Sequence, residues 1–165
     1  MVPMTGEKTV TPLVVSQFSE NLMRISPDGK WMAYQSNESN RNEIYVTPFP
    51  GPGGRVAASD NSGTEPVWGR DGRSLYYRSA NGAVVKVEVT TGARSTVGVR
   101  REGLPGDYLT DASHASYDVT PDGRFLMLKR AGAEAQTIVV HNWRRELRGK
   151  RRRGTRRQFC PPGVR

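Results

Sequence analysis

Three aspartates in nearly the same local sequence are the first candidates for chemistry in this chain of 165 residues. Asp28, Asp71 and Asp122 each precede a glycine, in the segments SPDG, GRDG and TPDG. Carboxylates that recur in this way could bind a metal ion or exchange protons with a substrate. The sequence offers only two histidines, His114 and His141, and a single cysteine as further ligands. We therefore expect no metal site, and we interpret each aspartate as part of a turn.

The other residues do not complete a known catalytic motif. A hydrolase of the α/β type carries its nucleophile in a Gly-x-Ser-x-Gly turn, which this sequence lacks. The glycine-rich loop, strand lysine, catalytic aspartate and Asp-Phe-Gly motif of a protein kinase are also missing. The segment GPGG at 51–54 lacks the Lys-Ser/Thr that follows a phosphate-binding loop, so we expect a plain loop. We expect no enzyme activity and no cofactor.

His114 is the one histidine that we consider as a ligand contact. It stands in DASHASYD, directly before an expected strand, where a loop side chain can face a ligand. The alternative is a structural hydrogen-bonding role, which is the commoner one. His141 lies beside Trp143 in an expected strand, where we expect it to be packed. We expect Trp31, Trp68 and Trp143 to pack between sheets rather than to form a binding cage.

The residues around each aspartate are those of a tight turn that leads into a strand. Proline presets φ for a type I turn, aspartate accepts bonds from nearby amides, and glycine accepts positive φ. The predicted turn residues are Pro27, Asp28, Gly29, Asp71, Gly72, Pro121, Asp122 and Gly123. A valine at Gly29 or Gly123 should therefore destabilise the fold. The same change at Gly51 or Gly53, in the GPGG loop, should matter less.

Each turn is followed by a nearly continuous apolar run: WMAY, SLYY and FLML. Apolar runs without alternation are typical of strands that are covered on both faces. Another strand-like segment precedes each turn, and a third follows at 42–49, 82–89 and 136–143. The repeating unit is therefore strand, turn, strand, loop and strand, with a weaker fourth strand.

The spacing of the turns predicts the fold class. The glycines Gly29, Gly72 and Gly123 are 43 and 51 residues apart. A period of about 40 to 50 residues with about four strands in each unit is typical of β-propeller blades. The sequence therefore predicts an all-β fold, a partial β-propeller of about three four-stranded antiparallel blades. A ring needs about four to eight blades, so we expect an open arc, with TPLVVS at 11–16 as the outer strand of a further blade.

The predicted domain organisation follows from this repeat. Residues 1–8 form a flexible N-terminus, residues 9–147 the partial propeller, and residues 148–165 a basic disordered tail. The three repeats lie at about 17–60, 61–103 and 112–147.

The repeat, written SPDGKWMAYQSNES and then NEIYVTPF, resembles the blade of TolB-like, WD-repeat-like β-propellers. Segments such as GTEPVWGRDGRSLYYRS and SHASYDVTPDGRFLMLKR are still more similar to propellers in the C-terminal region of bacterial serine/threonine protein kinases. The resemblance covers about residues 9–147. It implies a non-catalytic propeller module that binds a protein or ligand, as a fragment of a larger receptor-type kinase. The alternative is the substrate-gating propeller of a prolyl-oligopeptidase-like peptidase.

The formal net charge of +9 comes from one end of the chain. Residues 144–165 hold ten of the 25 basic residues and one of the 16 acidic ones, so the rest of the chain has fifteen of each. This tail could bind nucleic acid or an anionic surface. The residues concerned are Arg148, Lys150, Arg151, Arg152, Arg153, Arg156 and Arg157. The alternative is an extension with no binding role.

Two expectations concern partners and location. The open faces of an arc of blades should favour self-association. No export signal is recognisable, which favours the cytoplasm, whereas a membrane-bound parent would place the propeller outside the membrane.

Overall fold

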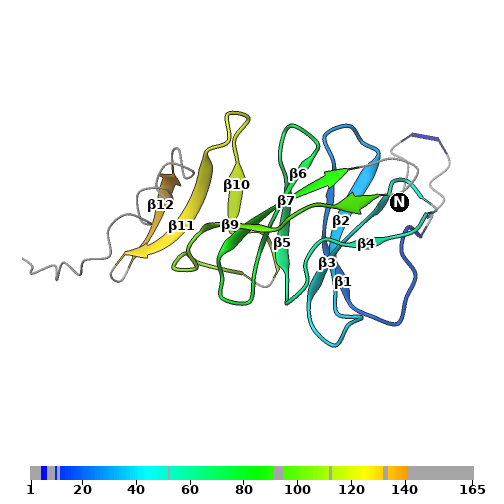
Figure 1. Cartoon of the computed structure of the whole chain (residues 1–165), viewed down its shortest axis with the longest axis horizontal. Helices are drawn as coiled ribbons and strands as arrows, with labels where there is room; N and C mark the ends of the chain where they lie inside the picture. Colours follow the sequence, from blue (N-terminus) through cyan, green and yellow to red (C-terminus); the bar gives the residue numbers. More distant parts are fainter. Residues whose placement is uncertain are drawn as a thin grey trace, which may run out of the picture.

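The computed structural model describes residues 5–6, 10, 12–51, 53–90, 95–111, 113–131 and 134–140, with 130–131 and 134–140 described by their backbone alone. These residues form antiparallel strands and turns without any helix, which confirms the expected all-β fold for this part of the chain. The strands make three sheets that follow one another along the long axis of the molecule (Figure 1). Within the same residues there is no helix that could cross a membrane.

The first sheet is a four-stranded meander in which each strand pairs with the next. Its strands are β1 (Glu20–Ile25), β2 (Trp31–Ser36), β3 (Glu43–Pro48) and β4 (Val56–Ala57), in that order. The apolar run WMAY lies in β2, which has a neighbouring strand on each side. This strand is buried along its whole length.

The second sheet repeats this arrangement with a longer and interrupted last strand. Its strands are β5 (Thr64–Trp68), β6 (Ser74–Arg78), β7 (Val84–Thr90), β8 (Thr96–Val97) and β9 (Arg101–Leu104). Both β8 and β9 pair with β7, the first near its end and the second near its start. The weaker fourth strand that the sequence indicates is therefore present in the first two sheets, as two residues in one and two short pieces in the other.

The third sheet consists of β10 (Tyr117–Val119), β11 (Phe125–Ala131) and β12 (Glu134–Val140) among the described residues. The turn between β10 and β11 repeats the turns of the other two sheets. Gly29, Gly72 and Gly123 have φ values of 72°, 64° and 78°. Each glycine donates its amide to the carbonyl three residues earlier, at 2.9 to 3.0 Å. The positive φ expected from the sequence is thus present at all three positions.

Apolar side chains fill the spaces between successive sheets. Leu75 and Tyr77 of β6 pack toward the first sheet with Trp31 and Trp68, whereas Tyr76 packs toward the third sheet with Phe125. Two-sided burial of β2 and β6 is therefore confirmed, as is the packing role of these two tryptophans. Trp143 and His141 lie outside the described residues.

The expectation that both faces of the strand are covered is wrong for the third apolar run, FLML. In β11, Phe125 and Met127 are buried, but Leu126 and Leu128 are 40% and 38% exposed. Within the described residues no further element lies on that face, so the strand alternates between buried and exposed side chains although its sequence does not.

The prediction of an outer strand at 11–16 is also wrong. Residues 12–16 pair with no strand. Instead, Leu13 and Val14 pack against Met32, Tyr34 and Tyr45 on the outer face of the first sheet. The segment covers this face with its side chains and does not extend the sheet at its edge.

The GPGG loop is less tolerant than its composition indicates. Gly51 has a φ of 82°, which a β-branched residue adopts only with strain. A Cβ built on Gly53 would lie 2.5 Å from Cγ of Pro48, which is too close. We therefore correct the expectation that valine at these two glycines matters less than in the turns.

Candidate functional site

A pocket of about 420 Å³ opens where the first strands of the three sheets come together. Strand β5 contacts both β1 and β10, so residues from all three sheets reach this space. We name it the inner-strand pocket, and its lining residues are Arg24, Ile25, Pro27, Val67, Trp68, Arg70, Ala115, Tyr117, Asp118 and Val119. Its volume lies within the usual range for ligand sites.

Three charged side chains line the inner-strand pocket, and all three are exposed. Arg24 Nη1 donates to its neighbour's carbonyl, Met23 O, at 3.0 Å. The carboxylate of Asp118 accepts the amide of Val119 at 2.7 Å. Among the described residues no ion pair involves Arg24, Arg70 or Asp118. The pocket thus presents two guanidinium groups and one carboxylate to solvent.

One wall of the pocket is held by a bond between the first two sheets. Trp68, the last residue of β5, lies in the core between these sheets and is buried with Trp31. Its indole Nε1 donates to the carbonyl of Arg24 at 3.0 Å. The bond fixes β1 beside β5, and with it the residues that β1 contributes to the pocket.

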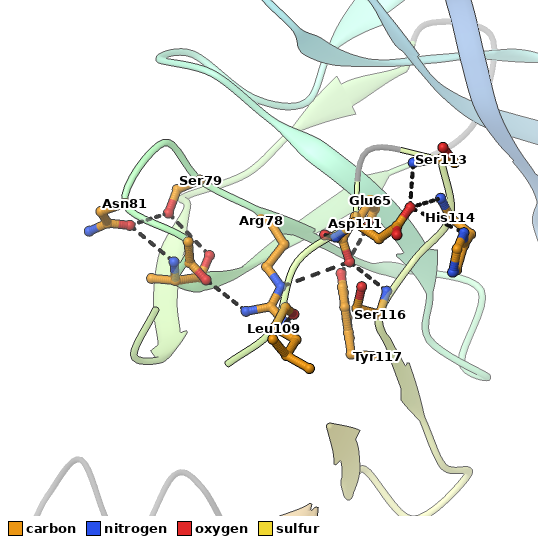
Figure 2. A network of polar contacts seen from close by, with 12 residues as sticks. Glu65, Arg78, Ser79, Asn81, Leu109, Asp111, Ser113, His114, Ser116 and Tyr117 are labelled. Atoms are coloured by element: carbon orange, nitrogen blue, oxygen red, sulfur yellow. Dashed lines mark hydrogen bonds and ion pairs between the residues drawn. The ribbon is translucent and has the colours of Figure 1, made fainter. Parts of the chain in front are cut away.

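The opposite wall is held by a buried charge network (Figure 2). Glu65 of β5 and Arg78 of β6 are both buried, with Nε of the arginine 4.0 Å from Oε2 of the glutamate. The carboxylate of Glu65 accepts the amides of Ser116 at 2.6 Å and Asp111 at 3.3 Å. The hydroxyl of Tyr117 donates to the carbonyl of Glu65 at 2.9 Å.

Arg78 extends this network to the loop that precedes β10. It donates to the carbonyls of Gly82 at 2.8 Å and Leu109 at 3.0 Å, and its guanidinium carbon lies 5.2 Å from the centre of the Tyr117 ring. These contacts dock the segment 109–117 on the second sheet. They therefore position Tyr117 and its neighbours, which form the far wall of the inner-strand pocket.

Burial dominates the electrostatics of this network. It raises the pKa of Glu65, although the amide of Ser116 and the charge of Arg78 act in the opposite direction. Burial also raises the pKa of Tyr117 well above its usual value, and the charge of Glu65 adds to the effect. Removal of one member of such a buried pair leaves the other charge without compensation, which is strongly destabilising.

Sequence reasoning did not single out Glu65 or Arg78. Glu65 occupies a register shift in β5 and has a φ of 53°, and Leu22 has a φ of 54° at the matching shift in β1. These two residues are 43 positions apart, as are Gly29 and Gly72. The available signal was a glutamate directly before the apolar PVW and an arginine directly after the apolar LYY.

The three turn aspartates take part in their own turns. Asp28 accepts Ser26 Oγ at 2.5 Å, Asp71 accepts the amide of Ser74 at 2.8 Å, and Asp122 accepts the hydroxyl of Thr120. Burial acts to raise the pKa of Asp71, but the hydrogen bonds of Ser74 and Arg73 and the charge of Lys86 together outweigh it, and the pKa is lowered. The turns lie in separate sheets, and no cluster of potential metal ligands occurs in the described part of the chain. Of the predicted turn residues, Pro27 lines the inner-strand pocket.

His114 lies beside this pocket but does not line it. Its side chain is 71% exposed, and its Nδ1 lies 3.2 Å from the carboxylate of Asp111. The same carboxylate accepts the backbone amide of Ser113 at 2.7 Å, and this bond lowers the pKa of Asp111 more than His114 does. His114 thus has a polar contact within its own loop, and the ligand contact that the sequence also allows stays a prediction. The basic tail residues from Arg148 to Arg157 lie outside the described residues.

Two comparisons with known proteins find no relative of the chain. A scan against models of known protein families finds no match to the chain. A search of curated proteins likewise finds no match.

Proposed function

We propose that the three sheets are blades of a partial β-propeller and that the chain is a non-catalytic module which binds a protein or ligand in the inner-strand pocket. The observation that carries this proposal is the position of the pocket, where the first strands of all three sheets meet. In propellers the blades surround a central channel, and ligand sites gather in loops and channels rather than in the packed sheets.

We extend the proposal to the family and its context, a TolB-like propeller from the C-terminal region of a bacterial receptor-type serine/threonine kinase. Support comes from repeated geometry as well as repeated sequence. The positive-φ residues Leu22 and Glu65 have the same spacing as Gly29 and Gly72, so each of the first two sheets carries the same bulge and the same turn.

Pocket filling tests the binding site directly. A ¹⁵N-labelled chain is screened by NMR against a mixed library of short peptides and small polar molecules. We expect binders to shift the amides of Ile25 and Tyr117 and the indole N–H of Trp68. Ala115→Trp, which fills the pocket, should abolish these shifts, whereas the control Thr96→Trp, at an exposed position of β8, should keep them.

A library without any binder that shifts Trp68 would overturn the proposal, and so would either of two further results. One is a set of binders whose shifts all lie away from the inner-strand pocket, or that bind the filled variant equally well. The other is phosphate transfer from labelled ATP to an acceptor protein by the purified chain, since this would show a catalytic activity that the proposed module lacks.

A further inference from the structure

We propose that the inner-strand pocket recognises an acidic peptide segment, with a ligand carboxylate held by Arg24 and Arg70 and an adjacent apolar side chain held by the pocket wall. This inference depends on the proposed function, because it names the ligand class of the same pocket.

The pairing of arginines in the described residues points to an anionic group. Five arginines have an acidic partner: Arg41 with Glu43, Arg55 with Glu38, Arg78 with Glu65, Arg100 with Asp60 and Arg124 with Asp122. Arg24, Arg70, Arg73 and Arg101 have none there, and of these four Arg24 and Arg70 line the same pocket. A guanidinium offers five N–H donors in a planar fork that matches a carboxylate, and Arg24 uses one of its donors on Met23 O.

The pocket also contains a negative charge, which predicts the direction in which each substitution changes the affinity. Asp118 is the one acidic residue that lines it, so two positive groups face one negative group. A ligand carboxylate gains from both arginines and is opposed by Asp118. Removal of an arginine and removal of the aspartate should therefore change the affinity in opposite directions.

The walls favour a peptide over a free anion. Val67 and Val119 are nearly buried core residues that reach the pocket, and Ile25 adds an exposed apolar side chain. These groups leave an apolar surface beside the arginines that inorganic phosphate or acetate would not use. A pocket of about 420 Å³ has room for a few side chains and not for a folded domain.

The backbone around the pocket also suits an extended chain. Among the described strands, β1, β5 and β10 each stand at the end of the strand order in their sheets, so each has an edge without a described neighbour in its own sheet. Edge strands offer main-chain donors and acceptors to a peptide that runs beside them. A nucleic acid would instead need a long basic stripe along its phosphates, and the inner-strand pocket has two arginines and an acid.

The test uses two matched peptides, acetyl-Leu-Glu-Leu-Glu amide and acetyl-Leu-Gln-Leu-Gln amide. Both are titrated into the full ¹⁵N-labelled chain, with the indole N–H of Trp68 as the local reporter. A local reporter is needed because the basic residues at 144–165 would attract any acidic peptide. We expect the Glu peptide to bind about threefold to tenfold more tightly than the Gln peptide, and the difference to shrink in 0.5 M salt.

Variants assign the effect to the pocket. Arg24→Gln and Arg70→Gln should each weaken the Glu peptide about threefold or more, and Asp118→Asn should strengthen it by a similar factor. The matched control is Arg101→Gln, an exposed arginine of β9 that has no ion pair in the described residues and does not line the pocket. It should leave the affinity unchanged. All variants are first compared by NMR dispersion to show that they are folded.

The outcomes separate the ligand class from the site. Equal binding of both peptides with shifts at Trp68 overturns the acidic preference but leaves the proposed function intact. Displacement of the peptide by acetate or phosphate at equal concentration, or by random duplex DNA, overturns the peptide proposal in favour of that ligand. Failure of the Glu peptide to shift Trp68 also overturns it, and if the mixed library fails there as well the proposed function falls too.

Discussion

The outer faces of the first and third sheets carry matching residues of the repeat but have different surroundings. Met32 and Tyr34 of β2 correspond, by their distance from the turn glycine, to Leu126 and Leu128 of β11. The first two are 2% exposed, whereas the second two are 40% and 38% exposed. The difference comes from the segment at 13–14, which packs on the first sheet. The comparison shows that the repeat specifies a strand, while burial depends on what covers it.

The largest expected effect is on the free energy of unfolding. Truncation of a side chain on the outer face should lower it strongly in the first sheet and only slightly in the third. Met32→Ala should lower the free energy of unfolding by about 2–4 kcal/mol, because it leaves a cavity under Leu13 and Val14. Leu126→Ala should lower it by less than about 1 kcal/mol, since that side chain is already exposed to water. Urea unfolding followed by circular dichroism measures both. Equal losses would mean that the face of the third sheet is covered in solution.

Substitution of the turn glycine should destabilise the first and third sheets equally, in contrast to truncation of the outer-face side chains. Gly29→Val and Gly123→Val should each destabilise the fold by about 1–2 kcal/mol, because both glycines have positive φ. Apart from the neighbouring residues in the chain, no atom lies within 4 Å of a Cβ built on either glycine, so no Cβ clash adds to the backbone strain. The measurement is the same urea titration. A much smaller loss at Gly123 would show that the third sheet contributes little to cooperative unfolding.

The exposed face should also control self-association. The two-site variant Leu126→Lys, Leu128→Lys should weaken association of the chain several-fold, because it places charge on the apolar face. Light scattering over a concentration series gives the mass of both chains. A matched control is Val99→Lys, which alters an exposed apolar residue outside this face. Unchanged association in the two-site variant would assign the contact to another surface.

The smallest expected effect is on the loss of stability at low pH, and it should be similar for the turns of the first and third sheets. Hydrogen bonds, first of all from Ser26 and Thr120, lower the pKa of Asp28 and Asp122. A carboxyl of this kind stabilises the fold above its unfolded pKa of 3.8, and the contribution is lost as the pH falls through the lower folded pKa. Asp28→Asn and Asp122→Asn should therefore each flatten the loss of stability below pH 4. Urea midpoints at pH 6 and pH 3 test this, and an unchanged slope in both variants would contradict it.

The candidate site shows how far sequence reasoning reached. The turn residue Pro27 was singled out and does line the inner-strand pocket, but the pocket's arginines, Arg24 and Arg70, were not. Nothing in the local sequence distinguishes these two from arginines that have acidic partners. Their common pocket arises because strands 43 residues apart lie side by side, which is a relation between sheets and not within one.

The sequence by itself determined the local structure of this protein. The glycines of the turns require positive φ, and the apolar runs after them form the central strands, because φ preference and side-chain period act over a few residues. Only the tertiary structure decided that residues 12–16 cover a sheet face, that Leu126 and Leu128 stay exposed, and that Glu65 and Arg78 meet in the core. These outcomes depend on which distant surfaces come into contact, and on the burial and charge compensation that result, so local pattern does not specify them.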